Sequence, residues 1–291
     1  MHGMARERSF QVSGLNIRVH TRHHFEEYVE FWGMLYRNRG TALYGSSAMM
    51  IGEARSENKD DPKAPITGYI YKFLNIDPNE PWFDIQRRKP ATEDEVLKVS
   101  IPDYLKPNLK TIPYVFLPTK HRLYFVSKSS DGGMAAATIH RLLSKLVLRQ
   151  QIIERFGEVD LTILTDRKAI DELLAWRVLK TLEIFIERPN ALEDEDEAEV
   201  LDRLERLSAG SERIILKKAP EEPTLTPDEG VKALSHIAAN HGEVKVSGKN
   251  AKGVREHASS KDFPMYERAS YDPNTQGALR ALVSFVMQKF L

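Results

Sequence analysis

The feature that most constrains the fold is a long helical pattern that lies between segments of strand character. Residues 132–157 carry apolar side chains at helical spacing, and Gly157 stands where a helix would end. Before this segment, "IPYVFLP" and "HRLYFVSKS" are rich in aromatic and β-branched residues and are joined by a short turn, which predicts a β-hairpin. After it, "EVDLTILT" predicts another strand. The chain is therefore neither all-α nor all-β.

The rest of the sequence continues this mixture. Further strands are predicted at residues 10–21, 46–55, 64–76, 180–189, 211–220 and 243–250. Further helices are predicted at residues 22–40, 92–102, 166–177, 226–242 and 277–291. Local signals refine these elements: a bulge near Gly14, a helix end at Gly40, Asp166 as an N-cap, and Thr226 as an N-cap followed by Pro227.

Strands and helices in this order predict an α+β (mixed α/β) fold with antiparallel or mixed sheets flanked by helices. The first 75 residues and residues 112–165 each place strands around one helix, so ferredoxin-like units are an option. We expect a main domain at residues 4–190 with a long insertion at 77–113, and a C-terminal domain or extension at 191–291. The second part begins with five consecutive acidic residues at 193–197, which favour a solvated helix over a metal site or a site for a basic partner.

Composition narrows the possible classes of protein. The chain has 42 basic and 42 acidic residues, so its net charge gives no evidence of a nucleic-acid or membrane partner, and any such partner requires a local patch. It has no cysteine, which excludes disulfides, thiolate metal sites and a cysteine nucleophile. The beginning lacks the apolar core of a signal peptide, and no run of apolar residues is long enough for a membrane helix. We expect a cytoplasmic protein without a membrane partner.

The sequence contains no established catalytic motif, so whether the chain is an enzyme stays open. It lacks the glycine patterns of phosphate-binding and dinucleotide-binding loops, and its nine histidines do not have the spacing of metal ligands. We therefore expect no cofactor and no metal. Histidine beside arginine or lysine can act in metal-independent RNA cleavage, which makes His23, His24 and His121 candidate catalytic residues; exposed histidines at the ends of elements are the simpler interpretation.

Two segments combine residue types that suit nucleic acid. In the insertion, "PWFDIQRRK" sets aromatic side chains beside basic ones, and near the C-terminus "HGEVKVSGKNAKGVREHASSKD" concentrates basic residues, His241 among them, among glycines and serines. The candidate nucleic-acid-binding residues are Trp82, Arg87, Arg88, Lys245, Lys249, Lys252 and Arg255. The alternative is an ordinary solvated hairpin and a loop that Trp82 and Phe83 anchor onto the sheet, with Pro78 and Pro81 stiffening it.

The middle of the chain resembles a bacterial protein family. "YKFLNIDPNEPWFD", followed by "ATEDEVLKVSIPDYLKPNLKTIPYVFLPTKHRLYFVSKS" and "FGEVDLTILTDRKAIDELL", is similar to the DUF4747 family, and the similarity extends from "RERSFQVSGLNIRVH" to "NHGEVKVSGKN". The resemblance implies a bacterial protein from an accessory or mobile-element setting in which phage-defence components are common. It assigns no activity and no functional residue.

Two functions follow as hypotheses. The first is an accessory protein that binds RNA or DNA and is associated with phage defence, with a metal-independent nuclease as a further alternative; it predicts that the histidines and the basic clusters converge. The second is a non-enzymatic interaction or assembly module, which predicts a protein partner or a homo-oligomer and no cleft of converging polar groups.

Overall fold

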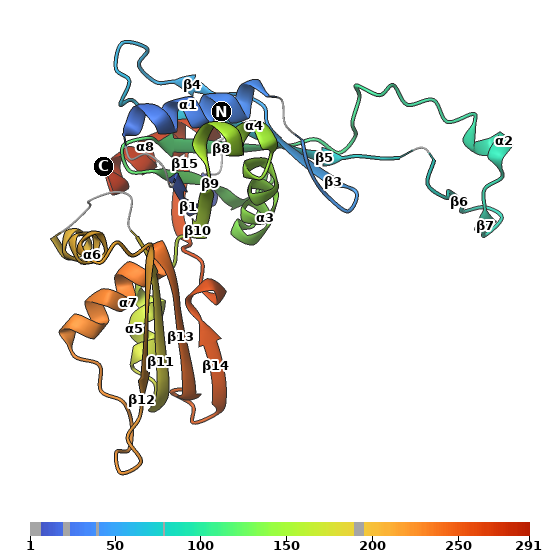
Figure 1. Cartoon of the computed structure of the whole chain (residues 1–291). Coiled ribbons are helices and arrows are strands. Elements are labelled where there is room, and N and C mark those ends of the chain that lie inside the picture. Colours follow the sequence, from blue (N-terminus) through green and yellow to red (C-terminus); the bar gives the residue numbers. More distant parts are fainter. Residues whose placement is uncertain (1–6, 20–23, 39–40, 78, 189–194) are drawn as a thin grey trace, which may run out of the picture.

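The protein forms two α+β domains and an extended arm (Figure 1). The computed structural model describes residues 7–19, 24–38, 41–77, 79–188 and 195–291. In these residues no helix is long and apolar enough to cross a membrane. The expected α+β class is confirmed.

The first domain is built on a nine-stranded sheet with the strand order β10-β1-β9-β8-β5-β3-β2, in which β15 also pairs with β1 and β4 with β5. Its strands are β1 (Arg8–Val19), β2 (Ala42–Tyr44), β3 (Ser47–Ile51), β4 (Arg55–Ser56), β5 (Ile66–Leu74), β8 (Lys110–Leu117), β9 (Arg122–Ser129), β10 (Val159–Ile163) and β15 (Glu267–Tyr271). Every pairing among them is antiparallel.

A ferredoxin-like unit forms the centre of this sheet. Helix α1 (Phe25–Arg37) follows β1, and helices α3 (Ala136–Val147) and α4 (Gln150–Phe156) lie between β9 and β10. The strands β1, β8, β9 and β10 therefore make a β-α-β-β-α-β unit with the order fourth-first-third-second. The ferredoxin-like option is confirmed for this domain, with β2 to β5 and the arm inserted between α1 and β8.

Alternate residues of the central strands pack into two separate cores, because successive side chains of a strand point to opposite faces. On β9, Leu123 and Phe125 pack with α1, α3 and α4, whereas Tyr124 and Val126 pack with α8 (Ala278–Phe290). The Tyr124 ring stacks on Phe290, with 4.3 Å between the ring centroids. The C-terminal helix thus covers the sheet face that α1 and α3 leave open.

The second domain is a four-stranded antiparallel sheet with the order β12-β11-β13-β14. Its strands are β11 (Val178–Glu187), β12 (Ser211–Lys217), β13 (Gly242–Lys249) and β14 (Arg255–Ser259). Helices α5 (Arg167–Leu174), α6 (Glu195–Arg206) and α7 (Glu229–His241) share an apolar core with one face of this sheet. A short 3-10 helix, η1 (Ser260–Asp262), ends the domain.

The chain enters and leaves the second domain through neighbouring segments. Residues 164–166 and 263–265 run side by side, joined by backbone hydrogen bonds from Asp166 to Phe263 and from Met265 to Leu164. The expected division at residue 190 separates β11 from its partners β12 and β13, so the sheets divide elsewhere, near residues 165 and 263. β15 and α8 return to the first sheet, a long-range pairing that local sequence patterns do not reveal.

Three local predictions need correction, and a fourth falls on a residue outside the described part of the chain. The helical pattern of residues 132–157 forms two helices, because the chain turns at Arg149, which has extended backbone angles and donates a hydrogen bond to the carbonyl of Thr41. The register of β1 against β9 shifts between Gln11 and Val12 and not at Gly14, and the extra residue, Ser127, lies on β9. The N-cap of α7 is Asp228, whose carboxylate accepts from the backbone N–H of Val231, and not Thr226. Gly40 lies outside the described residues, and α1 ends before it at Arg37.

The described residues between 75 and 109 form an arm that extends away from the first domain between β5 and β8 (Figure 1). The arm carries two short strands, β6 (Phe83–Asp84) and β7 (Lys89–Pro90), and the single-turn helix α2 (Glu93–Val96), which has the expected capping box of Thr92 and Glu95. No residue of the arm belongs to the apolar cores of the described residues, and α2 buries none of its side chains. The expectation that Trp82 and Phe83 anchor the insertion onto the sheet is wrong, since both lie on the arm and Phe83 is 65% exposed.

Candidate nucleic-acid interface

The second sheet has one face that none of the described helices covers. Along β12, Arg213, Ile215 and Lys217 are exposed, whereas Ile214 and Leu216 between them pack into the core. Residues opposite one another in an antiparallel pair point to the same side, so the register extends this open face across the sheet. The open face consists of Thr181, Glu183, Phe185, Arg213, Ile215, Lys217, Glu243, Lys245, Ser247, His257 and Ser259.

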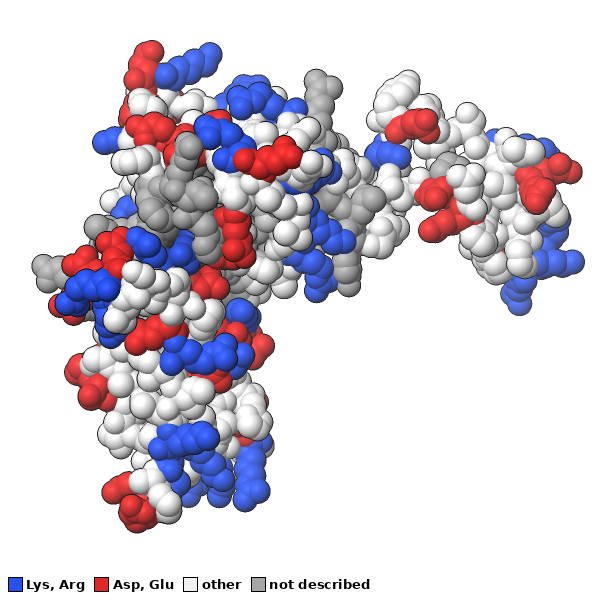
Figure 2. All heavy atoms as spheres, viewed as in Figure 1, with Lys and Arg blue, Asp and Glu red and all other residues white. Residues whose placement is uncertain are grey.

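Six basic residues gather at the end of this sheet that carries the β13–β14 turn. Lys249 pairs with both Val178 and Arg255, Lys217 lies opposite Thr181, and the guanidinium of Arg177 lies 3.4 Å from where a Cβ on Gly253 would be. We call this group the basic end; its members are Arg177, Lys180, Lys217, Lys249, Lys252 and Arg255. Figure 2 shows Lys and Arg side chains gathered there, at the lower end of the second domain, beside the acidic tip of the neighbouring β12–α7 loop.

The turn that presents these residues is fixed by its own polar groups. The side-chain oxygen of Asn250 accepts hydrogen bonds from the backbone N–H groups of Lys252 and Val254, at 2.9 and 3.1 Å. Gly253 has a φ of +78°, a conformation that glycine adopts without strain. The sequence "KNAKGVR" therefore folds into a defined turn that projects its cations into solvent.

The basic end differs from the other cations on this side of the sheet, because those cations are engaged in ion pairs. Arg213 lies 3.4 Å from Glu183, while Lys245 and Lys261 lie 3.3 and 3.2 Å from the carboxylate of Glu243. Partial burial opposes the charge of Glu243, but hydrogen bonds from Ser259 and the two lysines outweigh it and hold the pKa of Glu243 below its usual value. Within the described residues, no member of the basic end has an ion-pair partner. Their charge is therefore free to act on an external anion.

The expected interface is only partly assembled. Lys249, Lys252 and Arg255 lie together at the basic end, and Lys245 lies further along the same strand in an ion pair. Trp82, Arg87 and Arg88 lie on the arm, which leaves the other domain in a different direction (Figure 1). Arg87 forms ion pairs with Asp84 and Glu95. Hydrogen bonds from Arg87 to Asp84, first of all from the backbone N–H of Arg87, lower the pKa of Asp84. The two predicted clusters therefore do not converge.

The described histidines form no catalytic group with these cations. His24 lies at the N-terminus of α1, and His23 lies outside the described residues. His121 is 3% exposed and stacks on the ring of Tyr28, with 3.7 Å between the centroids, because the β8–β9 turn directs it into the core. The convergence that the nuclease hypothesis requires is absent from the described part of the chain.

The sequence position of His241 groups it with the basic hairpin, but the residue lies at the junction of the two domains. Its Nε2 is 3.1 Å from Oε1 of Glu197, and its Nδ1 is 3.2 Å from the side-chain nitrogen of Asn16 on β1. The amide of Asn16 also donates to the carbonyl of Asn240. Glu197 is 3% exposed, so this end of the acidic run is buried in the junction rather than solvated, and residues 193 and 194 lie outside the described residues.

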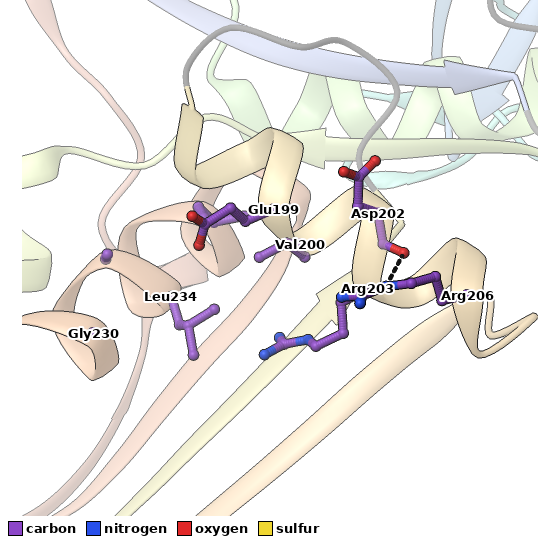
Figure 3. Close-up of a pocket in the computed structure, with 9 residues that line it drawn as sticks. Glu199, Val200, Asp202, Arg203, Arg206, Gly230 and Leu234 are labelled. Atoms are coloured by element: carbon purple, nitrogen blue, oxygen red, sulfur yellow. Dashed lines mark hydrogen bonds between the residues drawn. The ribbon is translucent and has the colours of Figure 1, made fainter.

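Two other hollows have balanced charge. A groove of about 490 Å³ lies between α6 and α7, where the carboxylates of Glu199 and Asp202 point in different directions (Figure 3). A cleft of about 590 Å³ lies between α3 and β10 of the first domain and the upper part of the open face, with charges of both signs. The described residues contain no group of three side chains able to hold a metal ion.

The fold and the surface together define a two-domain α+β protein with a ferredoxin-like first domain and a basic end on the second. The sequence model described as "Domain of unknown function (DUF4747)" matches residues 8–287, so the chain belongs to this family. No curated protein matched the chain in the sequence comparison.

Proposed function

We propose that the protein binds nucleic acid and that the basic end contacts the phosphate backbone. The observation that carries the proposal is the set of six cations without ion-pair partners among the described residues, collected at one end of a sheet in a chain of zero net charge. Clustered Lys and Arg side chains on one face are the usual electrostatic signature of phosphate contact.

The open face beside the basic end offers further contacts for the same ligand. A groove of about 460 Å³ runs along β11, β13 and β14; polar side chains such as Thr181, Ser247 and His257 line it, together with the charged side chains Glu183, Lys245 and Asp262. Hydroxyl and imidazole groups can hydrogen-bond sugars and bases. The basic end thus contributes most of the affinity for the nucleic acid, and the groove positions it.

We propose that the protein binds its nucleic acid in the cytoplasm. The resemblance to a bacterial accessory family, in which phage-defence components are common, supplies a setting in which RNA or DNA would be the partner. Nothing in the arrangement of the described histidines supports cleavage, so we propose binding and not a nuclease reaction.

The proposal is tested by charge reversal with a matched control. Labelled oligonucleotides of single-stranded RNA, single-stranded DNA and duplex DNA are titrated with the full chain and followed by fluorescence anisotropy. We expect the triple variant Lys249→Glu, Lys252→Glu, Arg255→Glu to bind at least tenfold more weakly. The control variant Arg88→Glu, Lys89→Glu, Lys98→Glu has the same change in charge on the arm and should bind like the wild type.

Three results would contradict the proposal. The wild type could fail to bind every probe at low salt, the triple variant could bind as tightly as the wild type, or both triple variants could weaken binding equally. The last result would indicate a nonspecific response to net charge.

A further inference from the structure

The arm exposes large apolar side chains along most of its length. Seven such residues lie in the 27-residue segment from Phe83 to Leu109: Phe83, Ile85, Leu97, Val99, Tyr104, Leu105 and Leu109. Ile85, Leu97 and Tyr104 are each more than 80% exposed. An apolar surface of this extent is typical of a segment that is covered by a partner.

We infer that the arm docks against the arm of a second copy of this chain, antiparallel to it, across a two-fold axis. A stable interface takes about 20–30 residues from each side, and the apolar segment of the arm falls within that range. A two-fold interface uses the same surface on both copies, so that surface must complement itself. The apolar residues occur near the tip and near the root, which lets the tip of one arm cover the root of the other.

The charges of the arm fit a second copy. Residues 75–109 contain five basic and seven acidic residues, so the arm carries a small net negative charge. An arm with a slight acidic excess does not attract a polyanion, and so small a net charge repels a second copy only weakly. This balance favours a protein partner over nucleic acid as the occupant of the arm.

The distribution of these charges favours the antiparallel arrangement. At the root, Lys72 and Lys110 lie opposite each other on β5 and β8, and Lys106 lies nearby in the sequence. At the tip, Glu93 and Asp94 occupy the first turn of α2, while Glu95 is engaged by Arg87. None of the first five has an ion-pair partner within the described residues, and antiparallel docking brings the root lysines of one arm to the acidic turn of the other.

The first test measures oligomeric state over a range of concentration by sedimentation velocity. The wild type should form a dimer, and the variant Phe83→Ser, Ile85→Ser, Leu97→Ser should shift the dimer dissociation constant upward by at least a hundredfold. These side chains lie outside the apolar cores, so the variant should keep its circular dichroism spectrum and melting temperature. The control Leu148→Ser, Leu207→Ser, Ile215→Ser removes exposed apolar residues elsewhere and should stay dimeric.

The second test determines the register of the two arms. Because the chain has no cysteine, single introduced cysteines report contacts without background. Mixing Leu97→Cys with Tyr104→Cys should give a disulfide between the two variants under mild oxidation, and each variant alone should give little. A Lys72→Glu, Lys106→Glu variant should be weakened as a dimer and restored by adding Glu93→Lys and Asp94→Lys.

The inference is overturned if the wild type stays a monomer at every concentration. It is also overturned if the arm variant dimerises like the wild type, or if Leu97→Cys links efficiently to itself. If a monomeric chain used its arm to bind lipid vesicles or another protein, the arm would have a partner other than a second copy.

Discussion

At the scale of single residues, Tyr114 links two parts of the first core. Its hydroxyl accepts from Nε1 of Trp32 at 2.9 Å and donates to the carbonyl of Glu53 at 2.7 Å. Tyr114→Phe leaves both partners without this hydrogen bond and should lower the free energy of unfolding by about 1–3 kcal/mol. Urea denaturation measures the change, and Tyr104→Phe on the arm, where the ring is 84% exposed, should show almost none.

The same residue predicts a response to alkaline pH. Burial raises the pKa of Tyr114 above its ordinary value, so the folded state keeps the proton that the unfolded state releases above about pH 10. Stability conferred by this group is present below that pH and is lost as the pH rises. The urea midpoint should therefore fall between pH 9 and pH 11, and Tyr114→Phe should reduce this fall. An equal fall in the variant would contradict the assignment.

Gly68 on β5 shows how closely backbones approach in this sheet. A Cβ at this position would lie 2.0 Å from the backbone oxygen of Glu53. Gly68→Ala therefore requires a backbone shift and should cost about 1–3 kcal/mol or more, as overpacking in a well-packed site does. Gly210→Ala, where a Cβ meets nothing within 4 Å, is the control in the same thermal denaturation experiment. Equal melting temperatures would show that β5 has room to move.

Side-chain roles were the part least accessible from the sequence. His121 and His241 carry the same signal, a histidine near a basic residue, yet both are buried, at 3% and 4% exposure. Their burial depends on contacts with Tyr28 and Glu197, which no local pattern indicates. Lys249, Lys252 and Arg255 could be grouped because one hairpin carries all three.

At the scale of elements, local signals located most helices and strands, and failed where two signals compete. Thr226-Pro227 and Asp228 both suit the start of α7, and the structure uses Asp228. Asp228→Ala should cost about 0.5–2 kcal/mol and Thr226→Ala almost nothing, because only the first removes the bond to the N–H of Val231. The reverse order in chemical denaturation would contradict the cap.

The ferredoxin-like unit could be anticipated from its element order, whereas the order of the complete sheet could not. The unit follows from helices placed between β1 and β8 and between β9 and β10, a pattern visible in the sequence. The return of β15 to β1 joins residues more than 250 positions apart, and α8 covers the second face with residues such as Phe290, which stacks on Tyr124, 166 positions earlier. Sequence periodicity reports which residues are apolar and not which surface they cover.

At the scale of the whole molecule, dimerisation and nucleic-acid binding would act together. Two copies joined by their arms present two basic ends, and a nucleic acid long enough to reach both gains affinity through effective concentration. The arm variant Phe83→Ser, Ile85→Ser, Leu97→Ser should therefore bind a long RNA at least tenfold more weakly and a short oligonucleotide unchanged. Equal loss on both probes would show that the arm itself contacts nucleic acid.

The salt dependence of binding tests the central claim most directly. The affinity of the wild type and of Lys249→Glu, Lys252→Glu, Arg255→Glu for a short single-stranded oligonucleotide is measured across a series of salt concentrations. Each phosphate contact contributes about 0.7 to the slope of log affinity against log salt concentration. We predict a linear decrease for the wild type and a slope smaller by about 2 for the variant. A wild-type affinity that does not change with salt, or equal slopes for both proteins, would contradict the assignment of the basic end.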